Sequence, residues 1–119
     1  VKRTVIKERR HSPANISTGD LATAAAQRCL ESAGVDPKRV DLVVLATLSP
    51  DRLMPATATT VQHRLRLNCA AMDLSAACAG FTYALATAMQ FVASGTSEYA
   101  LVIGADANSR VVDPNDKQT

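Results

Sequence analysis

The chain has 119 residues, enough for one small domain, with 13 basic and 11 acidic side chains. A net charge of +2 gives no field that would indicate a nucleic-acid partner. Three cysteines without regular spacing suggest neither a disulfide framework nor a zinc site, so we expect a reduced, cytoplasmic setting without a metal. No signal peptide is visible, and no apolar run is long enough to span a membrane.

The first third of the chain predicts a charged segment followed by a helix. A short strand is expected around Val5 and Ile6. Ser17 or Thr18 is placed to cap a helix that Gly34 ends, because small polar residues begin helices and glycine ends them. The apolar residues expected on its inner stripe are Leu21, Ala25 and Cys29.

The rest of the chain alternates between strand and helix patterns. Residues 40–48 form an apolar run rich in β-branched side chains, which is typical of a strand covered on both faces. The elements expected after it are a loop bracketed by Pro50 and Pro55, a helix over 56–67, a strand over 70–75, a helix over 79–94 and a strand over 99–105. This alternation predicts an α/β fold of βαβ units around a parallel sheet.

Cys78 stands at the predicted turn between a strand and a long apolar helix. Unpaired backbone N–H groups and the helix dipole favour a thiolate at such a position. Its neighbours Ala77, Ala79 and Gly80 are small and leave room for a bulky group to approach the sulfur. Two interpretations follow from position alone: a nucleophile that attacks a carbonyl, or a small apolar residue that fills a core.

The helix that follows Cys78 is apolar nearly all round. Phe81, Leu85, Met89 and Val92 form one face, and alanines occupy much of the other. A helix of this kind is expected to be buried on all sides, which would be unusual in a lone domain of this size.

The region around the cysteine resembles the active-site region of β-ketoacyl-[acyl carrier protein] synthase III. The matching segments are Ala-Ala-Cys78-Ala-Gly-Phe81 with Thr-Tyr-Ala-Leu after it, Ser-Gly95, Tyr-Ala-Leu-Val-Ile-Gly104-Ala-Asp106, and, elsewhere, residues 3–10, 17–22, 33–36, 41–47, 55–58 and 113–116. They cover nearly the whole chain in order, which is more specific than the cysteine motif alone.

The resemblance implies a thiolase-like layered sandwich, α-β-α-β-α, built from two similar halves. Residues 1–119 would supply most of the first βαβαβ half as a partial N-terminal half, trimmed at both ends. The second helix and sheet that cover the cysteine helix would come from the other half. That half would also supply a catalytic histidine and asparagine.

The activity implied by the resemblance is a decarboxylating Claisen condensation that initiates fatty-acid synthesis. Cys78 would take an acyl group from acyl-CoA and condense it with malonyl-[acyl carrier protein], without a metal, flavin or nicotinamide cofactor. The resemblance places Arg3 and Lys117 against coenzyme A, although the family often has arginine at the second position. Met54, where phenylalanine is common, would reach across a homodimer interface into the partner's acyl tunnel, or would merely pack at the dimer surface. Phe81 is counted with these substrate-binding residues.

The remaining reactive residues are expected to have no chemical role. Cys29 and Cys69 are interpreted as structural, and His11 and His63 fall in charged stretches unsuited to a catalytic base. Two other functions stay open beside a fatty-acid enzyme. One is a specialised acyltransferase or condensing enzyme of secondary metabolism on the same fold, and the other is a non-catalytic module that packs with a partner.

Overall fold

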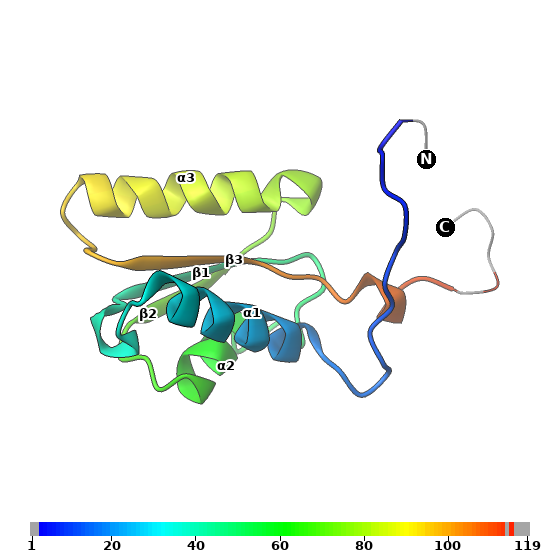
Figure 1. Ribbon diagram of the computed structural model, residues 1–119, viewed down its shortest axis with the longest axis horizontal. Coiled ribbons are helices and arrows are strands. Elements are labelled where there is room, and N and C mark those ends of the chain that lie inside the picture. The colour runs from blue at the N-terminus through cyan, green and yellow to red at the C-terminus, as the bar shows by residue number, and fades with distance from the viewer. Residues whose placement is uncertain (1–2, 114, 116–119) are drawn as a thin grey trace.

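The computed structural model describes residues 3–113 and 115 as three layers around a parallel, three-stranded sheet (Figure 1). The strand order is β2-β1-β3. The elements in chain order are α1 (Thr18–Ala33), η1 (Pro37–Arg39), β1 (Leu42–Ala46), α2 (Thr57–Arg64), β2 (Ala70–Leu74), η2 (Ala77–Ala79), α3 (Gly80–Ala93), β3 (Ala100–Gly104) and η3 (Asn108–Arg110). The predicted α/β class and parallel sheet are confirmed.

Strand β1 is the central strand, and its position explains its composition. All five of its residues are buried, as expected for a strand with layers on both faces. Val44, for example, lies opposite Met72 of β2 and Val102 of β3. The apolar run predicted over 40–48 is therefore the middle of the sheet.

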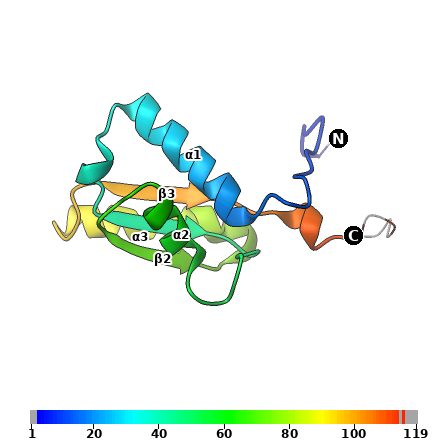
Figure 2. The ribbon, with the colours of Figure 1, turned by 90° about the horizontal axis from the view of Figure 1, so that it is seen from below.

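The helices lie on opposite faces because the chain moves across the sheet in two directions. From β1 it passes through α2 to β2 on one side, and from β2 it returns through α3 to β3 on the other. Crossovers of one hand in opposite directions place their helices on opposite faces. Figures 1 and 2 show α1 and α2 over one face and α3 over the other.

Helix α1 begins and ends as predicted, but its buried stripe is different. Ser17 caps it and forms a reciprocal pair of hydrogen bonds with Asp20, and Gly34 ends it in a left-handed conformation with φ of +64°. The prediction of an inner stripe at Leu21, Ala25 and Cys29 is wrong. The buried residues are Thr18, Gly19, Ala22, Ala26 and Leu30. Compared with the prediction, α1 is rotated about its own axis, because its small alanines pack closely on the sheet.

Helix α3 also packs through its alanines. Ala84 and Ala88 are buried against β1 and its neighbours, while Phe81 and Met89 are 51% and 59% exposed. Within this chain the large apolar face is uncovered, so the expected burial on all sides is not found here. None of the helices in the described part of the chain combines the length and apolar character needed to cross a bilayer.

The predicted strand at Val5 and Ile6 is wrong. The segment before α1 is irregular, and Val5 has φ of +59°, a left-handed conformation that interrupts an extended chain. A hydrogen bond of 3.2 Å between the Ser12 and Ser109 hydroxyls ties the later part of this segment to the residues that follow β3.

Candidate functional site at the Cys78 turn

Cys78 lies in the turn η2, immediately before α3 and after the carboxyl end of β2. It is exposed, and the residue before it, Ala77, has a left-handed backbone with φ of +46°. Such conformations are rare for residues other than glycine and gather at functional sites, where the surrounding structure holds them. The predicted position beside a helix N-terminus among small residues is confirmed.

Two glycines let the first turn of α3 approach the sheet closely. A Cβ on Gly80 would lie 3.4 Å from the Cβ of Ala46, at the end of β1. A Cβ on Gly104, at the end of β3, would lie 3.1 Å from Cδ2 of Phe81. The turn that carries Cys78 is therefore held over the carboxyl ends of strands, which is where open α/β sheets bind ligands.

The other residues predicted to bind substrate come from separate segments. Phe81 is three residues from Cys78 on the same turn of chain, half-exposed beside Gly104. Met54 lies in the loop between β1 and α2 and is 75% exposed. Arg3 is exposed in the irregular segment before α1, and Lys117 lies outside the described residues. Phe81 thus lies close to the Cys78 turn because the two adjoin in the sequence.

Asp106 ties together the loops that follow β1 and β3. One of its carboxylate oxygens, Oδ1, accepts hydrogen bonds from the Thr47 hydroxyl at 2.9 Å and the Leu48 N–H at 2.8 Å. The same oxygen accepts from the Ser49 N–H at 3.2 Å and the Ser49 hydroxyl at 2.9 Å. The Ser49 hydroxyl oxygen in turn accepts from the Ala107 N–H at 3.0 Å. This carboxylate therefore organises the edge of the sheet near the turn.

Asp73 has a comparable role at the start of α2. Its two carboxylate oxygens accept the N–H groups of Thr57 and Ala58, each at 2.8 Å. The N-cap residue of α2, Ala56, offers no side-chain oxygen of its own. An aspartate on β2 thus caps a helix that is distant in sequence. The interpretation of the sequence missed this role, although an acidic residue inside an otherwise apolar strand was a visible signal.

The two other cysteines differ from each other. Cys69 is partly buried, and burial raises the pKa of its thiol, with a further contribution from the Asp41 carboxylate. The expectation that Cys29 lies on a buried stripe is wrong, because it is exposed on α1. His11 and His63 are both exposed.

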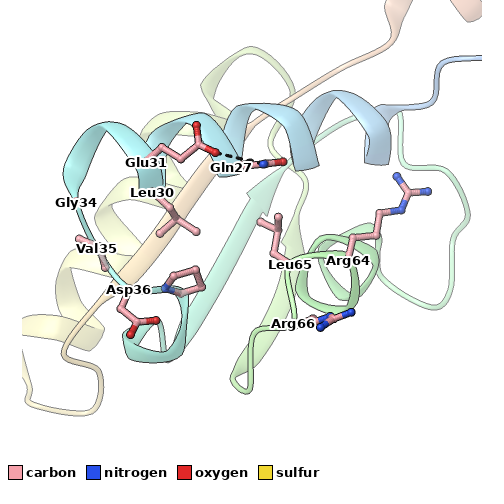
Figure 3. A pocket seen from close by; sticks show the side chains of 10 residues that line it. Gln27, Leu30, Glu31, Gly34, Val35, Asp36, Arg64, Leu65 and Arg66 are labelled. Atoms are coloured by element: carbon pink, nitrogen blue, oxygen red, sulfur yellow. Dashed lines mark hydrogen bonds between the residues drawn. The ribbon is translucent and has the colours of Figure 1, made fainter.

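A pocket of about 640 Å³ lies at the other end of the molecule, between the C-terminal ends of α1 and α2 (Figure 3). It is lined by Leu30, Val35, Leu65 and Arg66, among others. Residues 34–37 of its wall precede β1, whereas the Cys78 turn lies over the carboxyl ends of the strands. A five-residue strand spans about 16 Å, so this pocket is not part of the site.

Comparison with known proteins finds similarity to the same kind of enzyme by sequence and by structure. The family model for 3-oxoacyl-[acyl-carrier-protein (ACP)] synthase III matches residues 72–119, which include Cys78. A β-ketoacyl-[acyl-carrier-protein] synthase III of Rhodopirellula baltica is 51% identical over 119 residues, covering 100% of this chain and 34% of the relative. A relative of the same description from Geobacillus kaustophilus is 48% identical over 118 residues, which are 98% of this chain and 38% of that one.

Solved structures agree with this result. The 3-oxoacyl-[acyl-carrier-protein] synthase III of Aquifex aeolicus superimposes with a TM-score of 0.90 at 43% identity, over 96% of this chain and 37% of that one. A tetronic acid condensing enzyme superimposes with a TM-score of 0.78 at 45% identity, over 82% of this chain and 30% of that one. The chain spans about a third of the length of the curated relatives it matches. In its thiolase-like α/β fold and its cysteine turn, the chain is similar to about a third of a β-ketoacyl-[acyl carrier protein] synthase III.

Proposed function

We propose that this chain carries the nucleophile of a condensing enzyme that begins fatty-acid synthesis. The observation that supports this most directly is the exposed Cys78, in a left-handed turn before α3 at the carboxyl edge of a parallel sheet. Relatives about half identical to the chain are named β-ketoacyl-[acyl-carrier-protein] synthase III.

The first step is transfer of an acyl group to Cys78. The thiolate attacks the thioester carbonyl of acyl-CoA, the tetrahedral intermediate collapses, and the thiolate of coenzyme A leaves and takes up a proton. In this proposal, backbone N–H groups at the cysteine turn, together with one from the other half of the enzyme, bind the oxyanion of that intermediate. The small residues Ala77 and Ala79 leave the sulfur accessible to a substrate as large as coenzyme A.

The second step forms the new carbon–carbon bond. Malonyl-[acyl carrier protein] loses carbon dioxide, and the resulting carbanion attacks the acyl thioester and expels the Cys78 thiolate. A histidine and an asparagine from a second half of the enzyme stabilise the carbanion in this proposal. The reaction needs only its two thioester substrates, and Arg3 and Lys117 contribute positive charge toward the phosphates of coenzyme A.

The uncovered face of α3 fits an enzyme longer than this chain. Leu85, Met89 and Val92 are 41–59% exposed, and large apolar side chains in a row are normally covered in a folded protein. Since the chain spans about a third of the length of its relatives, the remainder of such an enzyme is available to cover this face.

We propose further that the enzyme works in the cytoplasm as a homodimer and that Met54 limits the acyl chain. Its exposed, unbranched side chain can reach a partner's acyl tunnel and adapt to its depth. Neither nucleic acid nor a membrane is required as a partner.

A second candidate is a condensing enzyme of secondary metabolism. It is favoured by the 45% identity to a tetronic acid condensing enzyme, which is as high as the 43% identity to the 3-oxoacyl-[acyl-carrier-protein] synthase III of Aquifex aeolicus. In this proposal the two candidate functions differ in the acyl groups that are condensed, so the acyl groups that the enzyme accepts distinguish them.

The test is covalent labelling of the full-length enzyme with a panel of radiolabelled acyl-CoA thioesters. We expect label on Cys78, located by peptide mapping, with short primers labelling most efficiently in a fatty-acid enzyme. Cys29→Ala is the matched control, since Cys29 is also an exposed thiol and should be dispensable. Labelling that survives Cys78→Ala would refute the assignment of the nucleophile, and labelling only by unusual acyl groups would favour the second candidate.

A further inference from the structure

The loop between β1 and α2 presents two apolar side chains to solvent. Leu53 is 94% exposed and Met54 is 75% exposed, although exposure of apolar surface to water is unfavourable. Exposed apolar residues at the tip of a loop are useful for binding only if the loop holds them in place, because ordering a flexible loop opposes binding. The anchoring of this loop therefore bears on what its tip can do.

The loop is anchored to two different helices through Asp51. The carboxylate of Asp51 accepts the N–H of Gly19, in the first turn of α1, at 3.2 Å to each oxygen. The backbone N–H of Asp51 donates to the hydroxyl oxygen of Thr57, the first residue of α2, at 3.0 Å. Gly19 and Thr57 are both buried, so the partners of Asp51 are held firmly by the core.

The contact between Asp51 and α1 is closely fitted. A Cβ added at Gly19 would lie closer to Oδ2 of Asp51 than van der Waals contact allows. The carboxylate therefore occupies the space that any other residue at position 19 would fill. It also lies at the N-terminus of α1, where unpaired N–H groups and the helix dipole favour a negative charge.

Asp51 is separated from Met54 by only two residues, Arg52 and Leu53. We infer that Asp51 is a positioning residue for the choice of acyl chain: it fixes the loop tip and so sets how far Met54 reaches. This inference rests on the proposed role of Met54 as the residue that limits the acyl chain. If the loop tip were more mobile, the Met54 side chain could move back and leave more room for a longer acyl chain.

The experiment measures kcat and KM of the full-length enzyme for acetyl-CoA and octanoyl-CoA in five variants, one of which is Met54→Phe. Asp51→Ala removes the carboxylate, and Gly19→Ala displaces it from the other side of the same contact. Asp51→Asn keeps an acceptor oxygen and should restore most of the native behaviour. Asp36→Ala is the matched control, because Asp36 also accepts a backbone N–H, from Lys38, but precedes β1 at the other edge of the sheet.

We expect the ratio of kcat/KM for octanoyl-CoA over acetyl-CoA to rise by about tenfold in both alanine variants at the Asp51–Gly19 contact, the effect that one methylene has in a hydrophobic pocket. The change should fall mainly on KM for the longer primer, and the Asp36 control should leave the ratio unchanged. A parallel loss for both primers, or a ratio that does not change, would overturn the inference. Met54→Phe separates the two levels: if it lowers the ratio while Asp51→Ala has no effect, the inference alone is wrong. If Met54→Phe has no effect, the proposed role of Met54 fails and the inference fails with it.

Discussion

Removing the carboxylate of Asp73 should destabilise the fold substantially although it lies outside the Cys78 turn. Asp73 accepts two backbone N–H groups at the start of α2, from Thr57 and Ala58. Because Ala56 cannot cap this helix, Asp73→Ala would leave both N–H groups without their partner. Asp73→Asn would keep one acceptor oxygen and turn an NH₂ group toward the other N–H.

The size of the effect follows from the number and kind of hydrogen bonds. A hydrogen bond to a charged group contributes about 1.5–3 kcal/mol. Asp73 is half-buried, so we take the lower value for each bond and expect Asp73→Ala to lower the free energy of unfolding by about 3 kcal/mol. Asp73→Asn should lower it by about half as much. Removal of an ordinary exposed cap such as Asp36 should lower it by about 0.5–1 kcal/mol.

The assay is urea unfolding of the full-length enzyme, followed by circular dichroism, for Asp73→Ala, Asp73→Asn and Asp36→Ala. The expected order of destabilisation is the order in which they are named, with the slope of the free energy against urea unchanged. Acyl transfer to Cys78 should persist in Asp73→Asn below its unfolding transition. An Asp73→Ala variant within about 0.5 kcal/mol of the native enzyme would refute the capping argument. Loss of acyl transfer in a fully folded Asp73→Asn variant would instead indicate a catalytic carboxylate.

Three further predictions concern reactivity, acid and solubility. Iodoacetamide should modify the exposed Cys78 and Cys29 before Cys69, whose pKa is raised by burial, and prior incubation with acyl-CoA should protect only Cys78. Equal rates of modification of Cys69 and Cys78, measured by peptide mass spectrometry, would contradict this. Hydrogen bonds from the Ser17 backbone and then from the Arg64 guanidinium lower the pKa of Asp20 from 3.8, so Asp20→Asn should lower the stability above about pH 5. The difference in stability between the native enzyme and this variant should vanish as acid protonates Asp20, and a difference in urea midpoint that is the same at about pH 7 and about pH 3 would count against the prediction. Expressed alone, residues 1–119 should aggregate because the large apolar face of α3 is uncovered, and a monodisperse monomer in size-exclusion chromatography would show otherwise.

The local signals in the sequence were sufficient for most of the fold. Ser17 and Gly34 marked the ends of α1, and the apolar run over 40–48 identified the central strand, because caps and buried strands depend on the residues nearby. The position of Cys78 was predictable for the same reason, since small residues and a strand-to-helix turn adjoin it in the chain. The strand predicted at Val5 failed because a strand needs a partner, and no local pattern shows one.

Tertiary structure alone decided which faces of the helices pack and what the aspartates do. Helix α3 is apolar nearly all round, so its pattern could not distinguish the buried Ala84 side from the exposed Phe81 side. The close approach of the helix to the sheet selects the small residues. Asp51, Asp73 and Asp106 accept N–H groups from other segments of the chain, up to 58 residues away. Hydrogen-bond donors that folding brings together leave no periodic mark in a sequence, because their spacing is set by the crossing of strands and helices and not by the chain itself.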